Sequence, residues 1–125
     1  VFHQQCEEML RSLTTGEKIT TEVRRLLLQS AGDFLGISQI AKHLNMSERT
    51  LRRKLKTESV SFRTLFEEVR DLLATEYLTK TDLTVAHIAH LLSYSETVNF
   101  RRAFVRWNGI TPSEYRQRQA DQVKA

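Results

Sequence analysis

The chain has 125 residues, a net charge of +4 and a hydrophobic content of 40%, with only four glycines and one proline. This composition suits one helix-rich globular domain or two small subdomains, and it excludes a low-complexity or disordered chain. The single cysteine cannot form an intramolecular disulfide, and no apolar run approaches the roughly 20 residues that span a bilayer, so we expect a cytoplasmic protein. Because the sequence does not begin with methionine, we interpret it as a fragment of a longer protein.

The predicted elements are helices along almost the whole chain. Apolar residues recur at helical spacing, and no segment shows sustained alternation with turn dipeptides. We therefore expect an all-α fold of about seven helices. The segments with the helical pattern are residues 2–13, a stretch from Thr20 or Thr21 to the break at Gly32-Asp33, and residues 37–44, 48–57, 62–78, 85–92, 96–107 and 111–119.

Polar residues that can cap a helix precede most of these segments. Pro112 follows Thr111, and Glu114 comes three residues after the threonine, which is the pattern of a reciprocal capping box. Asn45 tolerates the left-handed conformation, so residues 45–47 are predicted to form a tight turn. The other expected N-caps are Thr20 or Thr21, Ser47, Ser61 and Thr84.

The chain contains an internal repeat. Residues 40–44 align with residues 88–92 at an offset of 48, which places Asn45 on Ser93 and Ser47 on Ser95. In the following helices the apolar positions align better at an offset of 49. There Leu51 matches Phe100, Leu55 matches Phe104, and Arg52-Arg53 matches Arg101-Arg102. The second copy therefore has one extra residue.

Each copy has the pattern of a helix-turn-helix unit, in which a short helix, a turn and a second helix follow one another. The small side chains of Ala41 and Ala89 allow the second helix of each unit to pack closely. That second helix buries Leu51 and Leu55, or Phe100 and Phe104, and leaves long donors on the opposite face. We also place Trp107 and Tyr115 in the core, because apolar residues at helical spacing usually face it.

The positive charge is concentrated in the first unit. Residues 37–57 contain six cations and one anion, a net charge of +5, whereas residues 62–82 contain three cations and five anions, a net charge of −2. A helix that enters the major groove needs hydrogen-bond donors for base edges and phosphates. The candidate DNA-binding residues are Arg49, Arg52, Arg53 and Lys56 in the first unit, and Thr97, Val98, Asn99, Arg101, Arg102 and Arg106 in the second.

The second unit carries a long motif that resembles a known family. Residues 85–104, followed by Trp107-Asn108-Gly109-Ile110-Thr111-Pro112-Ser113-Glu114-Tyr115-Arg116, are similar to the signature of the AraC/XylS family of bacterial transcription regulators. Residues 46–55 resemble the first recognition helix of that family. The sequence departs from the family pattern at Asn45 and Ser93, where glycine is usual. The resemblance implies base contacts from Arg49, Arg52, Arg53, Thr97, Val98, Arg101 and Arg102.

The family resemblance also implies a domain organisation and partners. We expect sequence-specific binding of double-stranded promoter DNA by two recognition helices in adjacent major grooves, as part of an activator that contacts RNA polymerase. Effector binding and dimerisation would belong to a missing N-terminal domain. The expected organisation is a connector helix at 1–16, a first helix-turn-helix subdomain at 17–60, a linker helix at 61–82, a second subdomain at 83–119 and a frayed tail at 120–125.

Other functions remain as alternatives. The basic face could belong to a helical protein-interaction module with an acidic partner, since charged stretches are often only a solvated surface. His87 and His90 lie three residues apart but have no partner ligands, and Cys6 near His3 falls on an apolar stripe. We therefore expect no metal, no cofactor and no enzymatic activity.

Overall fold

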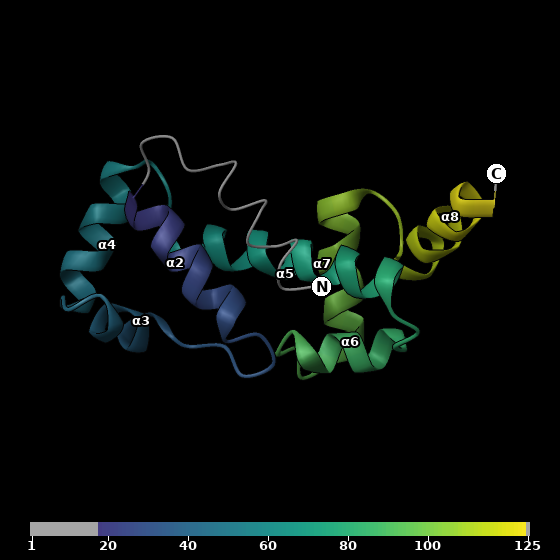
Figure 1. Ribbon diagram of the computed structural model, residues 1–125, viewed down its shortest axis with the longest axis horizontal. Coiled ribbons are helices and arrows are strands. Elements are labelled where there is room, and N and C mark those ends of the chain that lie inside the picture. The colour runs from purple at the N-terminus through teal and green to yellow at the C-terminus, as the bar shows by residue number, and fades with distance from the viewer. Residues whose placement is uncertain (1–17, 125) are drawn as a thin grey trace. The chain divides into compact units, whose positions relative to one another are not determined.

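The computed structural model describes residues 18–124, which form seven helices and no strand (Figure 1). The predicted all-α fold is confirmed. The predicted helix over residues 2–13, with the connector and Cys6, lies outside the described residues. The helices are α2 (Lys18–Gln29), α3 (Ile37–His43), α4 (Glu48–Thr57), α5 (Phe62–Lys80), α6 (Val85–Leu91), α7 (Thr97–Asn108) and α8 (Pro112–Lys124).

The chain divides after Val69 into two compact units. The first unit contains α2, α3, α4 and the beginning of α5, and the second contains the rest of α5 with α6, α7 and α8. Helix α5 is continuous across the division. Each unit therefore contains one short helix, one turn and one following helix, as the internal repeat predicts.

The core of the first unit comes from one face of each of its helices. Ala41 on α3 is only 1% exposed, and Leu51 and Leu55 on α4 are 0% and 1% exposed, as predicted. The remaining core side chains come from α2, α3 and α5, and they are Val23, Leu26, Leu27, Leu28, Ile40, Leu65 and Val69. Burial of Leu51 and Leu55 fixes which face of α4 is turned to the outside.

The core of the second unit is built around two phenylalanines of α7. The rings of Phe100 and Phe104 lie 6.0 Å apart and both side chains are fully buried. The rings of Phe104 and Tyr115 on α8 pack edge to face, with their centres 5.5 Å apart. Tyr115 and Trp107 are only half-buried, so the prediction that they are core residues was too strong. Both large rings lie where α7 and α8 reach the surface of a small unit.

Side-chain caps fix the starts of most helices as predicted. The hydroxyl of Ser47 accepts a hydrogen bond from Thr50 N at 3.1 Å, and Ser61 does the same for Thr64 N at 3.1 Å. Thr84 accepts from His87 N at 3.0 Å. The capping box of α8 is also present: Glu114 N donates to Thr111 Oγ1 at 3.1 Å, and Thr111 N donates to Glu114 Oε1 at 3.2 Å.

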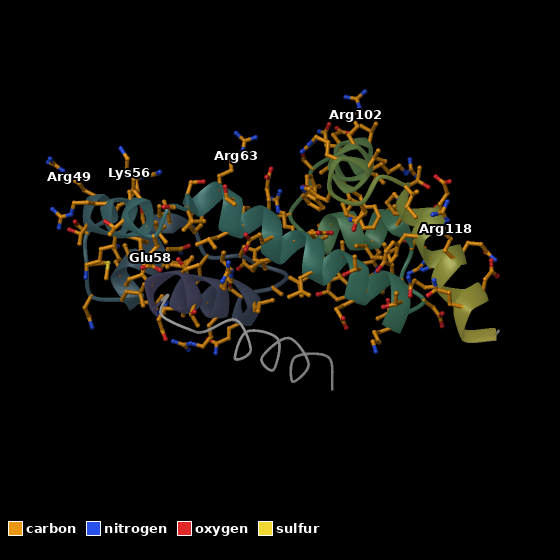
Figure 2. All side chains as sticks on the ribbon, turned by 90° about the horizontal axis from the view of Figure 1, so that it is seen from above. Arg49, Lys56, Glu58, Arg63, Arg102 and Arg118 are labelled. Carbon is orange, nitrogen blue, oxygen red and sulfur yellow. The ribbon has the colours of Figure 1, made fainter. Side chains whose placement is uncertain are left out.

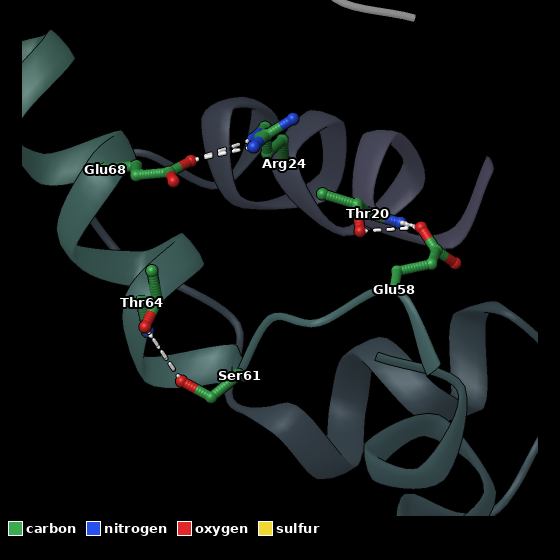
Figure 3. A network of polar contacts seen from close by, with 6 residues as sticks. All are labelled: Thr20, Arg24, Glu58, Ser61, Thr64 and Glu68. Carbon is green, nitrogen blue, oxygen red and sulfur yellow. Dashed lines mark hydrogen bonds and ion pairs between the residues drawn. The ribbon is translucent and has the colours of Figure 1, made fainter. Parts of the chain in front are cut away.

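The predicted cap of α2 is wrong. Helix α2 begins at Lys18, so Thr20 and Thr21 lie inside its first turn. Thr20 is buried, and its backbone N–H and its hydroxyl both donate to Glu58 Oε1, at 3.2 and 2.7 Å (Figure 3). A carboxylate 38 residues away thus bonds a free amide in the first turn of α2, and the Thr20 hydroxyl donates to this carboxylate instead of capping the helix. Arg24 on the same helix pairs with Glu68 on α5 at 2.9 Å.

The two turns share one strained position. Asn45 has φ 58° and Ser93 has φ 66°, so both adopt the left-handed conformation predicted for this place in the repeat. Tyr94 N donates to Ala89 O as Met46 N donates to Ala41 O, each at 3.0 Å. Beyond this point the two units no longer align at an offset of 48. Ser47 is the N-cap of α4, whereas the N-cap of α7 is Glu96 and not Ser95. Ser95 is therefore the extra residue of the second unit.

Replacing Ser93 with glycine is expected to raise the free energy of unfolding by about 0.5–1 kcal/mol. A residue other than glycine in the left-handed region costs roughly 1–2 kcal/mol, and the added freedom of glycine in the unfolded chain offsets part of that gain. Urea unfolding followed by circular dichroism measures the change. Ser95→Gly is the matched control, because Ser95 has no positive φ. Equal stabilities of the two variants would contradict the strain at Ser93.

The end of α5 is held by the last helix. The guanidinium of Arg116 on α8 donates to the backbone oxygens of Leu78 at 3.0 Å, Thr81 at 3.3 Å and Tyr77 at 3.4 Å. A cation at a helix C-terminus satisfies free carbonyls and complements the helix dipole. Helix α5 accordingly runs to Lys80, two residues further than predicted.

Helix α8 is longer than the sequence suggested. It continues to Lys124, whereas the sequence predicts a frayed tail at 120–125. Among the polar pairs that follow the helical register, the Gln117 amide donates to Asp121 Oδ1 at 3.2 Å. Contacts between side chains four residues apart support a helix, and they explain how the polar end of the chain stays helical. None of the described helices is long and apolar enough to cross a membrane.

Candidate DNA interface

The first candidate surface is the outer face of α4. Since Leu51 and Leu55 are buried, the long side chains on the other positions of the helix are turned outward. Figure 2 shows the side chains of Arg49 and Lys56 extending away from the helix. All four predicted residues of this helix, namely Arg49, Arg52, Arg53 and Lys56, are exposed, as is Lys54. We call these five residues the α4 basic face.

One carboxylate lies within the α4 basic face. Glu48 Oε2 accepts a hydrogen bond from Arg52 Nε at 3.2 Å, one turn along the helix. Its other oxygen accepts from the hydroxyl of Ser38 on α3 at 2.6 Å. The Ser38 hydrogen bond and then the contact with Arg52 lower the pKa of the Glu48 carboxyl below its usual value. Glu48 is therefore ionised at neutral pH and is bonded on both sides.

The second candidate surface is the outer face of α7. Phe100, Ala103 and Phe104 are buried, and the side of the helix facing away from them is exposed. The side chain of Arg102 extends outward from this helix (Figure 2). A shallow groove on the same helix is lined by Val98, Arg101, Arg102, Val105 and Arg106. This face thus combines three cations with two exposed valines, Val98 at 46% and Val105 at 39% exposure.

The start of α7 differs from the start of α4. The N-cap residue of α7, Glu96, makes no side-chain cap hydrogen bond, whereas the side chain of Ser47 accepts a cap hydrogen bond in α4. In the turn before α7, Tyr94 packs beside Phe100 at 5.7 Å, and the Arg70 guanidinium lies 4.2 Å from the centre of the Tyr94 ring. Ring packing therefore holds this turn where a hydroxyl cap holds the other one. Of the predicted residues here, Asn99 is exposed and Thr97 is half-buried.

A hydrogen bond to a half-buried carboxylate ties α7 to α5 within the second unit. The Asn108 side-chain amide donates to Asp71 Oδ1 at 2.8 Å. Burial raises the pKa of the Asp71 carboxyl, and the hydrogen bond from Asn108 offsets part of that rise. This hydrogen bond fixes the C-terminal end of α7 against α5.

Sequence reasoning missed four residues at or beside these surfaces, namely Lys54, Glu48, Val105 and Ser38. Lys54 entered only the charge count, although it lies between two predicted DNA-binding residues. Glu48 entered the charge count only as an anion, although its position four residues before Arg52 is the spacing of a helical ion pair. Val105 was not named, although it lies seven residues after Val98 and hence on the same face. No sequence signal indicated Ser38, because its contact with Glu48 depends on how α3 packs against α4.

The predicted absence of a metal site stays a prediction. His87 and His90 on α6 are both exposed. Within residues 18–124, no group of three or more histidine, cysteine, aspartate or glutamate side chains is placed to hold a metal ion. The described part of the chain gives no positive reason to assign one.

Two helix-turn-helix units, each with an exposed cationic face on its second helix, define the class of helix-turn-helix DNA-binding domains. The sequence profile described as "Helix-turn-helix domain" matches residues 40–118 of the chain. The chain belongs to this family, in its AraC-type form. The resemblance drawn from the sequence is thereby confirmed.

Relatives of this chain are named as transcription regulators. The chain is 45% identical over 114 residues to the ornithine utilization regulator of Pseudomonas aeruginosa, an alignment that covers 91% of this chain and 34% of that protein. It is 34% identical over 94 residues to the urease operon transcriptional activator of Escherichia coli, covering 75% of this chain and 32% of that protein. The chain thus spans about a third of the length of these relatives.

A solved structure shares the fold. The DNA-binding domain of the global transcriptional factor AdpA, determined in complex with a target DNA, superposes with a TM-score of 0.69 at 24% sequence identity. The match covers 82% of this chain and 94% of the other. At this identity the comparison shows that the fold is common to both.

Proposed function

We propose that this chain is the DNA-reading part of a transcription regulator, and that it binds double-stranded DNA sequence-specifically through α4 and α7. The observation that carries the proposal is the α4 basic face, in which five exposed cations lie on the part of the helix surface that Leu51 and Leu55 do not bury in the core. A helix of this kind fits the major groove, whose width admits one helix and whose base edges need donors. Membership of the AraC-type family supports the same function.

The residue types assign different roles within the α4 basic face. An arginine can form two hydrogen bonds with the O6 and N7 atoms of guanine, which gives Arg49, Arg52 and Arg53 the chemistry of base recognition. Lys56 and Lys54 present compact charges suited to phosphates. Phosphate contacts position the protein and base contacts specify the sequence.

The α7 surface has a more mixed chemistry. Val98 is exposed and apolar and suits the methyl group of thymine, while Asn99 suits adenine. Arg101, Arg102 and Arg106 supply donors for guanine or phosphate. Thr97 lies at the helix start, where side chains of recognition helices meet base edges. We propose that α7 reads fewer bases through hydrogen bonds than α4 does.

Two reading helices imply a bipartite site. We propose that α4 and α7 occupy adjacent major grooves, with residues 61–82 as the linker between subdomains at 17–60 and 83–119. Successive major grooves on one side of the duplex are about 10 base pairs apart. The recovered site is therefore expected to contain two short conserved blocks with roughly that spacing.

Selection of bound duplexes from a random pool tests this function. The expected result is a defined motif whose duplex competes with random DNA by a factor of about 10³ or more at fixed salt. A helical module that attracts acidic partners by charge alone would show no preference among duplexes, and affinity would follow only ionic strength. Recovery of no motif would overturn the proposal.

Replacing Lys56 with alanine is expected to weaken binding to all duplexes by a similar factor. A lysine on a phosphate releases about one counterion, so the slope of log affinity against log salt should fall in magnitude by about one. Fluorescence anisotropy titrations at several salt concentrations measure the slope. Lys80→Ala, which removes an exposed lysine at the end of α5, is the charge control. A changed base preference with an unchanged slope would assign Lys56 to base reading instead.

The wider setting is also a proposal. We infer that the full protein carries a sensing and dimerisation domain outside this chain, and that it activates transcription through contact with RNA polymerase. Activation is supported by the name of one relative, the urease operon transcriptional activator. A protein that reads promoters in a bacterium works in the cytoplasm. We assign the chain no catalytic role, since the family consists of DNA-binding regulators.

A further inference from the structure

The α4 basic face contains a polar arrangement that base reading alone does not require. Ser38, Glu48 and Arg52 form a continuous chain of two hydrogen bonds that joins α3 to the recognition helix. All three side chains lie at the surface of the first unit, and the side chain of Arg52 is 60% exposed. A carboxylate in this position also has a cost, because it brings a negative charge towards the phosphates that the neighbouring cations would bind.

We propose that Glu48 is a positioning residue for base recognition: anchored by Ser38, it holds the Arg52 guanidinium in one orientation so that Arg52 reads guanine. This inference rests on the proposed function.

The geometry of the contact supports this role. Glu48 Oε2 is bonded to Nε of Arg52, and its other oxygen is occupied by the Ser38 hydroxyl at 2.6 Å. Engagement of Nε leaves the two terminal nitrogens of Arg52 as the donors available to a base. Two parallel donors match the O6 and N7 acceptors of guanine. Adenine offers only one acceptor with a donor beside it, so a fixed pair of donors discriminates between the two purines.

The energetic benefit comes from ordering Arg52 before DNA arrives. Immobilising one long side chain at an interface costs about 0.5–1.5 kcal/mol, which corresponds to roughly two- to tenfold in affinity. The hydrogen bond from Ser38 matters because Ser38 lies on α3 and Arg52 lies on α4. The Glu48 carboxylate is therefore held by one residue of each helix. Within residues 18–124, neither Arg49 nor Arg53 forms an ion pair of this kind, which distinguishes Arg52 within the same face.

A purely structural role for Glu48 makes different predictions. A carboxylate in the first turn of a helix favours the helix through its dipole, and its loss would weaken binding to every duplex by a similar factor. Positioning predicts opposite effects on two measurements. Glu48→Ala should reduce discrimination between guanine and adenine at the Arg52 base pair by about two- to tenfold. It should also strengthen binding to random DNA, because one negative charge is removed from the interface.

The test is a set of affinity ratios measured at fixed salt with the full chain. The probes are the duplex selected from the random pool and a variant with adenine in place of guanine at the pair where Arg52→Ala abolishes the preference. Ser38→Ala breaks the anchor without changing the charge, so it should lower the ratio and leave random binding unchanged. Glu67→Gln removes a similar carboxylate from the weaker 3.9 Å pair with Arg63 and should change neither.

A double-mutant cycle makes the result decisive. In an Arg52→Ala background, Glu48→Ala and Ser38→Ala should have no further effect on the guanine-to-adenine ratio, since the residue they act through is gone. Unchanged ratios in both single variants, with the wild type still preferring guanine, would overturn the positioning role and leave the proposed function intact. A wild type without preference for any duplex would overturn both.

Discussion

Replacing Arg52 with alanine is expected to weaken binding to the selected duplex by about 1–3 kcal/mol, or roughly 5- to 150-fold, and to flatten the base preference at one position. The reason is the loss of two donors from the exposed face of α4, opposite the buried Leu51 and Leu55. Arg53→Ala should have an effect of similar size at a neighbouring base pair. Anisotropy titrations against the selected duplex and its single-base variants measure both changes.

The control for this prediction is Arg63 on α5. Its side chain is 87% exposed and its replacement by alanine removes the same charge outside the α4 basic face. Arg63→Ala should leave the base preference unchanged and reduce affinity only through the lost charge. If the double variant of Arg52 and Arg53 bound the selected duplex as tightly as the wild type, α4 would not be the reading helix.

Replacing Phe104 with alanine is expected to lower the free energy of unfolding by about 3–5 kcal/mol, which is the usual cost of removing a buried phenylalanine ring. Phe104 is fully buried and its ring contacts both Phe100 and Tyr115. Loss of the ring would leave a cavity between α7 and α8. Because the same helix presents Arg101 and Arg102, binding to DNA should fall together with stability.

Two further variants test whether the loss of stability depends on burial of the side chain in α7. Val105→Ala changes a side chain that is 39% exposed, so it should alter the free energy of unfolding by no more than about 0.5 kcal/mol. Phe104→Leu keeps an apolar side chain in the site and should recover much of the stability that alanine loses. Chemical denaturation followed by circular dichroism provides the measurement. A Phe104→Ala variant as stable as Val105→Ala would show that the core of the second unit lies elsewhere.

The two units use different contacts to fix equivalent turns. The turn before α4 depends on the Ser47 cap, and the turn before α7 depends on the Tyr94 ring between Phe100 and Arg70. The extra residue, Ser95, is accommodated because no cap hydrogen bond from Glu96 has to be preserved.

Local patterns in the sequence were sufficient for most of the helices. The bounds of α4 follow from Ser47 as the cap and from apolar residues at helical spacing, and both features depend only on neighbours in the chain. The left-handed turn at Asn45 was predicted from the residue type, and Ser93 was singled out because the family usually has glycine there; both residues have a positive φ. Exposure of the arginines on α4 followed from the burial of Leu51 and Leu55.

The sequence by itself therefore determined the helices, the repeat and the cationic faces. The reason is that apolar spacing, helix capping and local charge depend only on residues close together in the chain. Only the tertiary structure decided the contacts between distant residues. Glu58 meets Thr20, Arg116 meets the end of α5, and Ser38 meets Glu48 because helices pack side by side, at separations that no periodicity encodes. The contacts of Glu58 and Ser38 hold the two ends of α4 in the first unit, and the contact of Ser38 is the one from which we propose a positioning role for Glu48.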